Sequence, residues 1–167
     1  CSGFTVRATG NITVDGVVEA SAVEAGGDLV VAKGVLGNNQ AVITAHRTIY
    51  AKYLENCRVH ARENLQTDCI VNCDVYSDGA VQVRSGRGTI IGGCVRAANE
   101  INASVVGSRS ERPTTIVLGG MPCEDFEKEL LQQEIREMTE EFEKVQRQPD
   151  SPAKLSRLST LRMKIAV

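Results

Sequence analysis

Six cysteines and two histidines are among the side chains in this sequence that could bind a metal ion or act as nucleophiles. Cys69 and Cys73 lie four positions apart, and Cys57 and Cys94 are close to them along the chain. Structural zinc sites usually use tighter pairs of thiols than these four residues provide, so the spacing is a weak signal for a metal. We expect no metal site here.

Packing is the better interpretation of two of these thiols. Cys57 and Cys73 stand two positions before an apolar residue that recurs along the chain, where other copies have Ser21, Ala41 and Gly93. That position therefore takes a small residue, and a free cysteine packs as a small hydrophobic side chain. We expect Cys57 and Cys73 to stack on adjacent turns, buried and reduced, as thiols remain in a cytosolic protein.

The two histidines are predicted to point into solvent. His60 lies between Val59 and Ala61, and His46 follows Ala45; these three neighbours fit the inward positions of a strand. Neither histidine has a Ser, Cys or Asp partner that recurs with it. The sequence therefore predicts no catalytic residue.

Cofactors, nucleic acids and membranes have little support in the composition. Gly86-Arg87-Gly88 and Gly92-Gly93 are not followed by the Gly-Lys-Ser or Gly-Lys-Thr of a phosphate loop, and no helix is expected there. Residues 1–122 carry eleven acidic and eleven basic side chains, so no basic surface is predicted for nucleic acid. No apolar run approaches the roughly 18 residues of a membrane span. We expect no cofactor, no nucleic acid and no membrane insertion.

The elements that position these residues are strands of one recurring phrase. An apolar residue is followed by a small residue two on, an aliphatic residue six on, and another small or apolar residue eight on. The lead apolar residues are Val6, Val23, Ile43, Val59, Val75 and Val95, and the steps between them are 17, 20, 16, 16 and 20 residues. A further apolar position near offset eleven holds Val17, Leu54, Ile70 and Val106.

Alternation within a phrase predicts a strand, and a strand that recurs at a nearly fixed step predicts a solenoid. We therefore expect an all-β, right-handed parallel β-helix over residues 1–121, with at least six turns between about Gly3 and Leu118. One inward column should hold the lead residues from Val23 to Val95, with a second column beside it. Residues of the second column are Ala25, Ala45, Ala61, Ser77 and Ala97.

After residue 121 the apolar period changes to that of a coiled coil. Apolar residues separated by steps of four and three favour a helix that begins at Pro122, and Gln148-Pro149-Asp150 interrupts it. An acidic first helix and a basic second helix favour an antiparallel hairpin over residues 122–167, with Val145 opposite Leu155 and Phe142 opposite Leu158. The candidate interaction seam is Leu131, Ile135, Met138, Phe142, Val145, Leu155, Leu158, Leu161 and Ile165.

The sequence is interpreted as a fragment. It starts inside a strand pattern without a Met, and it stops at Val167 without a helix cap. We expect truncation at both ends.

Several segments resemble the flagellar assembly protein A family of bacteria. Tyr50–Cys57 resembles the family's aromatic-Ala-Lys-aromatic-Ile-Glu-Asn-Ala segment, and Gly88–Ala97 resembles its Gly-x-Ile-x-Gly-Gly-x-x-Arg-Ala segment. The match continues through 103–108 and 115–119 and ends in a coiled coil. The resemblance implies a right-handed parallel β-helix with a coiled-coil hairpin in a cytoplasmic protein. It also implies a role in flagellar assembly and polar organisation, with partners among flagellar or sugar phosphotransferase components, and it supplies no catalytic residue.

The leading functional hypothesis is therefore a non-enzymatic scaffold that presents surfaces and a helical arm to protein partners, with self-association also open. One alternative is a bactofilin-like scaffold that polymerises through its open coil ends. An acyltransferase on a left-handed β-helix would need 18 residues per coil, which the steps do not give. A polysaccharide-active enzyme would need clustered carboxylates, and Asp68, Asp74 and Asp78 fall at different offsets of the repeat.

Overall fold

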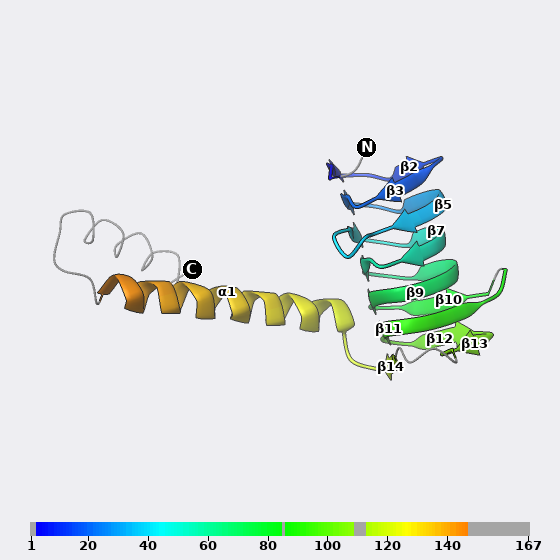
Figure 1. The fold of residues 1–167 in the computed structure, drawn as a ribbon. Coiled ribbons are helices and arrows are strands. Elements are labelled where there is room, and N and C mark those ends of the chain that lie inside the picture. Colours follow the sequence, from blue (N-terminus) through cyan, green and yellow to red (C-terminus); the bar gives the residue numbers. More distant parts are fainter. Residues whose placement is uncertain (1–2, 85, 109–112, 147–167) are drawn as a thin grey trace. The chain divides into compact units, whose positions relative to one another are not determined.

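The computed structural model describes residues 3–84, 86–108 and 113–146, which form two units that divide after Glu124. The described residues of the first unit form a stack of coils with fourteen strands, which Figure 1 shows as a ribbon. The strands are β1 (Thr5–Ala8), β2 (Ile12–Val14), β3 (Val17–Glu19), β4 (Ala22–Ala25), β5 (Leu29–Leu36), β6 (Val42–Ala45), β7 (Ile49–Glu55), β8 (Arg58–Ala61), β9 (Leu65–Ser77), β10 (Ala80–Val83), β11 (Thr89–Ala97), β12 (Glu100–Ala103), β13 (Val105–Val106) and β14 (Thr114–Leu118). Helix α1 (Pro122–Gln146) follows.

Every strand pairing in the stack is parallel, and the strands form three faces. The first face carries β1, β4, β6 and β8, followed by the last parts of β9 and β11 and by β14. The second face carries β2, β10, β12 and the first parts of β5, β7 and β9. The third carries β3, β13 and the remaining segments of β5, β7, β9 and β11. A parallel β-solenoid of about six turns is thus confirmed. Its right-handed sense stays a prediction.

The core is a set of aliphatic columns, one residue per coil, that run along the stack. The lead residues pair in register from Val6 through Val59 and Val75 to Val95 and then Ile116, as the repeat predicts. The column beside it runs from Ala8 to Ala97 with Ser77 in place, as expected. In the middle coils these side chains are fully buried, so the solenoid is held by apolar contacts between successive turns.

The prediction for Val17 is wrong by one residue. Val18, not Val17, pairs with Val35 and continues the third-face column through Leu54, Ile70 and on to Val106. The register of β5 against β7 shifts between Val31 and Gly34, because the earlier coil has one more residue at this bend. A prediction that uses a fixed offset along the sequence does not account for such an extra residue.

Two kinds of corner connect the faces. At one corner, a side-chain oxygen of one coil accepts a hydrogen bond from a backbone N–H of the next, as Asn11 does from Asp28 (2.8 Å) and Asn64 from Ala80 (2.9 Å). At another corner, Asn56 and Asn72 adopt left-handed backbone conformations, with φ of 49° and 51°. Their side chains form a ladder through a 3.3 Å bond from Asn72 Nδ2 to Asn56 Oδ1. Asparagine suits both corners, because its amide binds backbone groups and it tolerates this conformation.

Candidate interaction surfaces

The first turn of α1 is attached to the solenoid. The N–H of Cys123 donates a 2.8 Å hydrogen bond to Oδ1 of Asp78, and its thiol lies 3.4 Å from the carbonyl oxygens of Ala61 and Tyr76. Met121, which precedes Pro122, has no strong acceptor of its own, so Asp78 acts as the cap of this helix. Burial and the nearby Asp78 raise the pKa of Cys123 to about 12, so this thiol stays protonated at neutral pH.

Within α1, the predicted seam changes from exposed to buried along the helix. Leu131 is 58% exposed and Ile135 is 47% exposed, whereas Met138 and Phe142 are half-buried and Val145 is 3% exposed. The other four seam residues, Leu155, Leu158, Leu161 and Ile165, lie outside the described residues, as does the expected hairpin. The described helix therefore presents the apolar side chains of Leu131 and Ile135, near its middle, to solvent.

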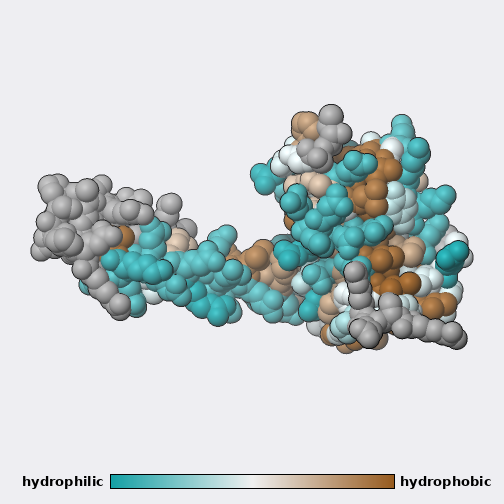
Figure 2. Space-filling view, in the orientation of Figure 1, coloured by the Kyte–Doolittle hydropathy of each residue, from teal (hydrophilic) through white to brown (hydrophobic). Residues whose placement is uncertain are grey.

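The remaining surface of α1 is acidic. Pro122–Gln146 contains nine acidic and three basic side chains. Two of the bases pair locally, Lys128 with Asp125 and Lys144 with Glu140, at 4.0 and 3.8 Å. Such exposed pairs contribute little stability. Figure 2 accordingly shows mostly hydrophilic residues along the helix, and the exposed seam residues are apolar positions within an acidic surface.

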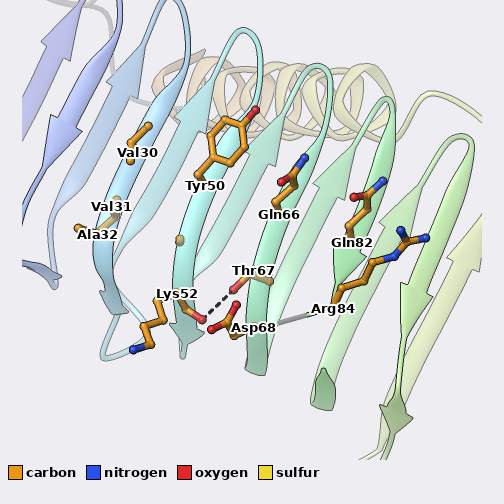
Figure 3. Close-up of a pocket in the computed structure, with 11 residues that line it drawn as sticks. Val30, Val31, Ala32, Tyr50, Lys52, Gln66, Thr67, Asp68, Gln82 and Arg84 are labelled. Atoms are coloured by element: carbon orange, nitrogen blue, oxygen red, sulfur yellow. Dashed lines mark hydrogen bonds between the residues drawn. The ribbon is translucent and has the colours of Figure 1, made fainter. Parts of the chain in front are cut away.

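A groove crosses the second face of the solenoid. Its volume is about 340 Å³, and it crosses β5, β7, β9 and β10. Tyr50, Gln66 and Gln82 project side by side from successive coils, as Figure 3 shows, and they pair in register. Lys52 and Asp68 lie further along β7 and β9, and Arg84 follows the end of β10. The groove therefore offers amide donors and acceptors, one aromatic ring and charges of both signs.

The prediction that His60 points into solvent is wrong, although that for His46 is confirmed. His60 projects from the outward side of β8, yet its exposure is only 8%. Its ring stacks on that of Tyr76 in the next coil, with 4.8 Å between centroids and 7° between planes. Cys123 also contacts the carbonyl oxygens of Ala61 and Tyr76, so the start of α1 lies against the same region. Alternation predicted the face correctly, but it carries no information about what covers that face.

The thiols stack as the repeat predicts. Cys57 and Cys73 are free, buried and on adjacent coils, with 3.5 Å between their sulfur atoms. Cys73 also donates a 3.2 Å hydrogen bond to the carbonyl oxygen of Val71. The hydrogen bond between the sulfurs and burial raise the pKa of Cys57. No group of three or more His, Cys, Asp or Glu in the described ranges has the geometry to hold a metal ion.

The three aspartates that a polysaccharide-active enzyme would need are not brought together. Asp68 lines the groove on the second face, and Asp74 lines a separate cavity beside Cys57. Asp78 caps the start of α1. Each carboxylate thus lies in different surroundings, and the arrangement gives no pair for acid–base catalysis.

The two ends of the solenoid expose apolar residues. Phe4 and Val6 lie at the first coil, and Val105, Val106 and Leu118 lie at the last described coil. A cavity of about 240 Å³ at the first coil is lined mainly by apolar residues, including Phe4 and Val18. In the described part of the chain no further strand covers the outer edges of these coils.

Architecture and surfaces together define a parallel β-solenoid followed by a helix with an apolar seam. The chain belongs to the Flagellar Assembly Protein A beta solenoid domain family, whose model matches residues 1–165. Neither a curated protein nor a solved structure shows significant similarity to it. No helix among the described residues combines the length and hydrophobicity needed to cross a membrane.

Proposed function

We propose that this chain is a non-enzymatic, cytoplasmic scaffold of flagellar assembly and polar organisation, and that α1 binds its protein partner. The observation that carries the proposal is the exposure of Leu131 and Ile135, which lie four residues apart on one face of the helix. Membership of the flagellar assembly family supports the biological setting. Partners would be flagellar or sugar phosphotransferase components.

The exposed seam is suited to another helix or an apolar groove. Burial of one Leu or Ile side chain contributes roughly 1.5–3 kcal/mol, so two such residues can supply much of a modest affinity. The excess of carboxylates on the same helix favours a partner with basic residues around its apolar contact, because unlike charges speed and orient association. The hydrogen bond from the Cys123 N–H to Asp78 would anchor the first turn of this helix to the solenoid.

The test compares two neighbouring substitutions that add the same charge. Leu131→Glu changes the seam, whereas Gln132→Glu changes an exposed polar position beside it. We expect Leu131→Glu to weaken partner binding or self-association by at least about tenfold, and Gln132→Glu to leave it nearly unchanged. Sedimentation velocity and capture of identified flagellar or phosphotransferase proteins from a bacterial lysate supply the readout. Equal binding by wild type and Leu131→Glu contradicts the proposal.

The antiparallel hairpin is part of the same proposal. Half-buried Phe142 and buried Val145 support an apolar partner for the second half of α1. Phe142→Ala should weaken the helical unit by roughly 1.5–3 kcal/mol and spare the solenoid. Circular dichroism would show this as an earlier loss of helical signal before the β-sheet signal changes. An unchanged helical transition contradicts the hairpin.

A second candidate is a scaffold that polymerises end to end. The exposed apolar residues at the first and last coils favour it, because open parallel strands can pair with another copy. In that case the full chain should pellet as filaments, and Val6→Asp should abolish pelleting. Val42→Asp, an outward position in the middle of the stack, is the matched control. Soluble monomers at high protein concentration contradict polymerisation.

A further inference from the structure

We propose that Cys57 and Cys73 form an oxidative modification site, at which a peroxide-class oxidant joins two successive coils through a disulfide. The inference rests on the placement of the two thiols and is independent of the proposed scaffold function. In the resting protein both residues are free thiols. The sulfur atoms lie 3.5 Å apart, and no other side chain separates them.

The register of the strands already places Cys57 and Cys73 at a backbone separation that a disulfide can span. Cys57 precedes β8, and the register that pairs Arg58 with Asp74 sets Cys57 opposite Cys73. The N–H of Asp74 donates a 3.1 Å hydrogen bond to the carbonyl oxygen of Cys57, which fixes this part of the ladder. Parallel strands lie about 4.8 Å apart, and disulfides span Cα separations of roughly 4.4–6.8 Å. A shift of the two side chains, without movement of the coils, can therefore bring the sulfurs together.

The two thiols differ in their access to solvent. Cys57 is 5% exposed and lines a polar cavity of about 240 Å³, together with Asn39, Asn56 and Arg58. Cys73 is 0% exposed and does not line this cavity. A small oxidant that enters the cavity therefore meets Cys57 first, and Cys73 is placed as the resolving thiol.

The reaction balances with hydrogen peroxide as the oxidant. The Cys57 sulfur attacks one peroxide oxygen, the O–O bond breaks, and the departing oxygen takes the thiol proton and leaves as water. Cys57 is then a sulfenic acid. The Cys73 sulfur attacks the Cys57 sulfur, the S–O bond breaks, and the hydroxyl leaves with the Cys73 proton as a second water. Two thiols are oxidised and one peroxide is reduced to two waters.

The environment makes this reaction slow but selective. The hydrogen bond to the Cys73 sulfur and then burial raise the pKa of Cys57, so little of its thiolate is present at neutral pH, and the rate should rise with pH. The other described thiols are differently placed. Cys69 and Cys94 are half-buried, and Cys123 lies against backbone oxygens of the solenoid. The neighbouring sulfur, not the exposure of the thiol, therefore determines which pair forms.

The test treats the folded chain of residues 1–167 with hydrogen peroxide, blocks the remaining thiols under denaturing conditions, and maps disulfides by mass spectrometry. We expect one predominant intramolecular bond, Cys57 to Cys73, with the loss of two hydrogen masses. Cys69→Ser and Cys94→Ser should still form it. When dimedone, which traps sulfenic acids, is present during peroxide treatment of Cys73→Ser, its adduct should accumulate on Cys57. The same treatment of the chain in denaturant should give a mixture of bonds.

A thermal readout accompanies the mapping, because a cross-link between coils restricts the unfolded chain. Oxidised wild type should melt roughly 5 °C or more above the reduced form, and a reductant should reverse the shift. Cys57→Ala, which keeps a small residue at the position, should show no such shift if it folds. The proposal is overturned if Cys57 and Cys73 remain blockable after peroxide treatment. It is also overturned if a disulfide to Cys69 predominates, or if peroxide oxidises Cys57 to the sulfinic acid without forming a disulfide.

Discussion

At the scale of single residues, His60 couples the stability of the solenoid to pH. Burial, with smaller contributions from the positive charges of Arg58 and Arg62, lowers the pKa of His60 from 6.5 to about 4. Between these values the unfolded chain binds a proton that the folded chain does not bind. The free energy of unfolding should therefore fall as the pH drops through this window, by roughly 3 kcal/mol in total, and should be fully retained above it.

Urea titrations at about pH 7.5 and about pH 4.5 measure this effect. His60→Gln should remove most of the difference between the two conditions, because glutamine has no proton to gain. His46→Gln is the control, since His46 is exposed and should leave the difference intact. Equal pH dependence in wild type and His60→Gln would exclude His60 as the cause.

Gly93 is a second residue whose environment fixes its identity. Its φ of 79° is unfavourable for any residue with a side chain, and a Cβ atom there would collide with the backbone of Cys73. Gly93→Ala should therefore lower the free energy of unfolding by about 2–3 kcal/mol. Gly10→Ala, where a Cβ meets open space, should change it by no more than about 0.5 kcal/mol. Urea denaturation measures the free energy of unfolding of both variants. An unchanged value for Gly93→Ala would contradict the claim that position 93 requires glycine.

At the scale of the elements, the start of α1 depends on a residue 45 positions earlier in the chain. Asp78→Ala leaves the Cys123 N–H without its acceptor and should weaken the first turn by about 0.5–2 kcal/mol. Asp78→Asn retains a side-chain oxygen and should preserve most of the stability. Hydrogen exchange at the Cys123 and Glu124 amides is the measurement. If Asp78→Ala keeps the protection of the wild type at these amides, Asp78 does not act as the cap.

The strands were predictable from the sequence because each coil repeats one apolar pattern. Val59 and Val75 are neighbours because their phrases match, and the same logic found the stacked thiols. The pattern failed where length varied, so Val17 was assigned a place that Val18 occupies. It also failed for His60: the repeat pairs this residue with Tyr76, but alternation alone does not show that the ring of Tyr76 and the start of α1 cover it.

The candidate site was less predictable than the fold. Heptad spacing predicts a seam from Leu131 to Val145, but it does not show which of these side chains are exposed. The groove at Tyr50, Gln66 and Gln82 was missed, although an outward polar residue recurs there in three successive coils. That recurrence was a usable signal. The sequence gives no such signal for the hydrogen bond between Cys123 and Asp78, because no local pattern connects these two residues.

At the scale of the whole molecule, the stability of the solenoid depends on every middle coil, because each one contributes residues to the continuous aliphatic columns of the core. Val59 is fully buried between Ile43 and Val75, so Val59→Asp places an unpaired charge in the core and should unfold the solenoid. Val42→Asp, at an outward and exposed position of β6, should leave the fold intact. Circular dichroism and a Tm measurement separate the two variants. A folded Val59→Asp protein would contradict this account of the core.

The corner between β5 and β6 shows where such a protein is free to diverge. Leu36 and Val42 are separated by five residues, whereas their partners Glu55 and Arg58 are separated by two, and both pairs remain in register. Asn38 and Asn39, with φ of 46° and 61°, let the longer connection turn back without disturbing the columns. Insertions and deletions can therefore accumulate here across generations while the interior keeps its composition. For protein engineering, the same corner is a place to graft a foreign peptide onto a rigid support.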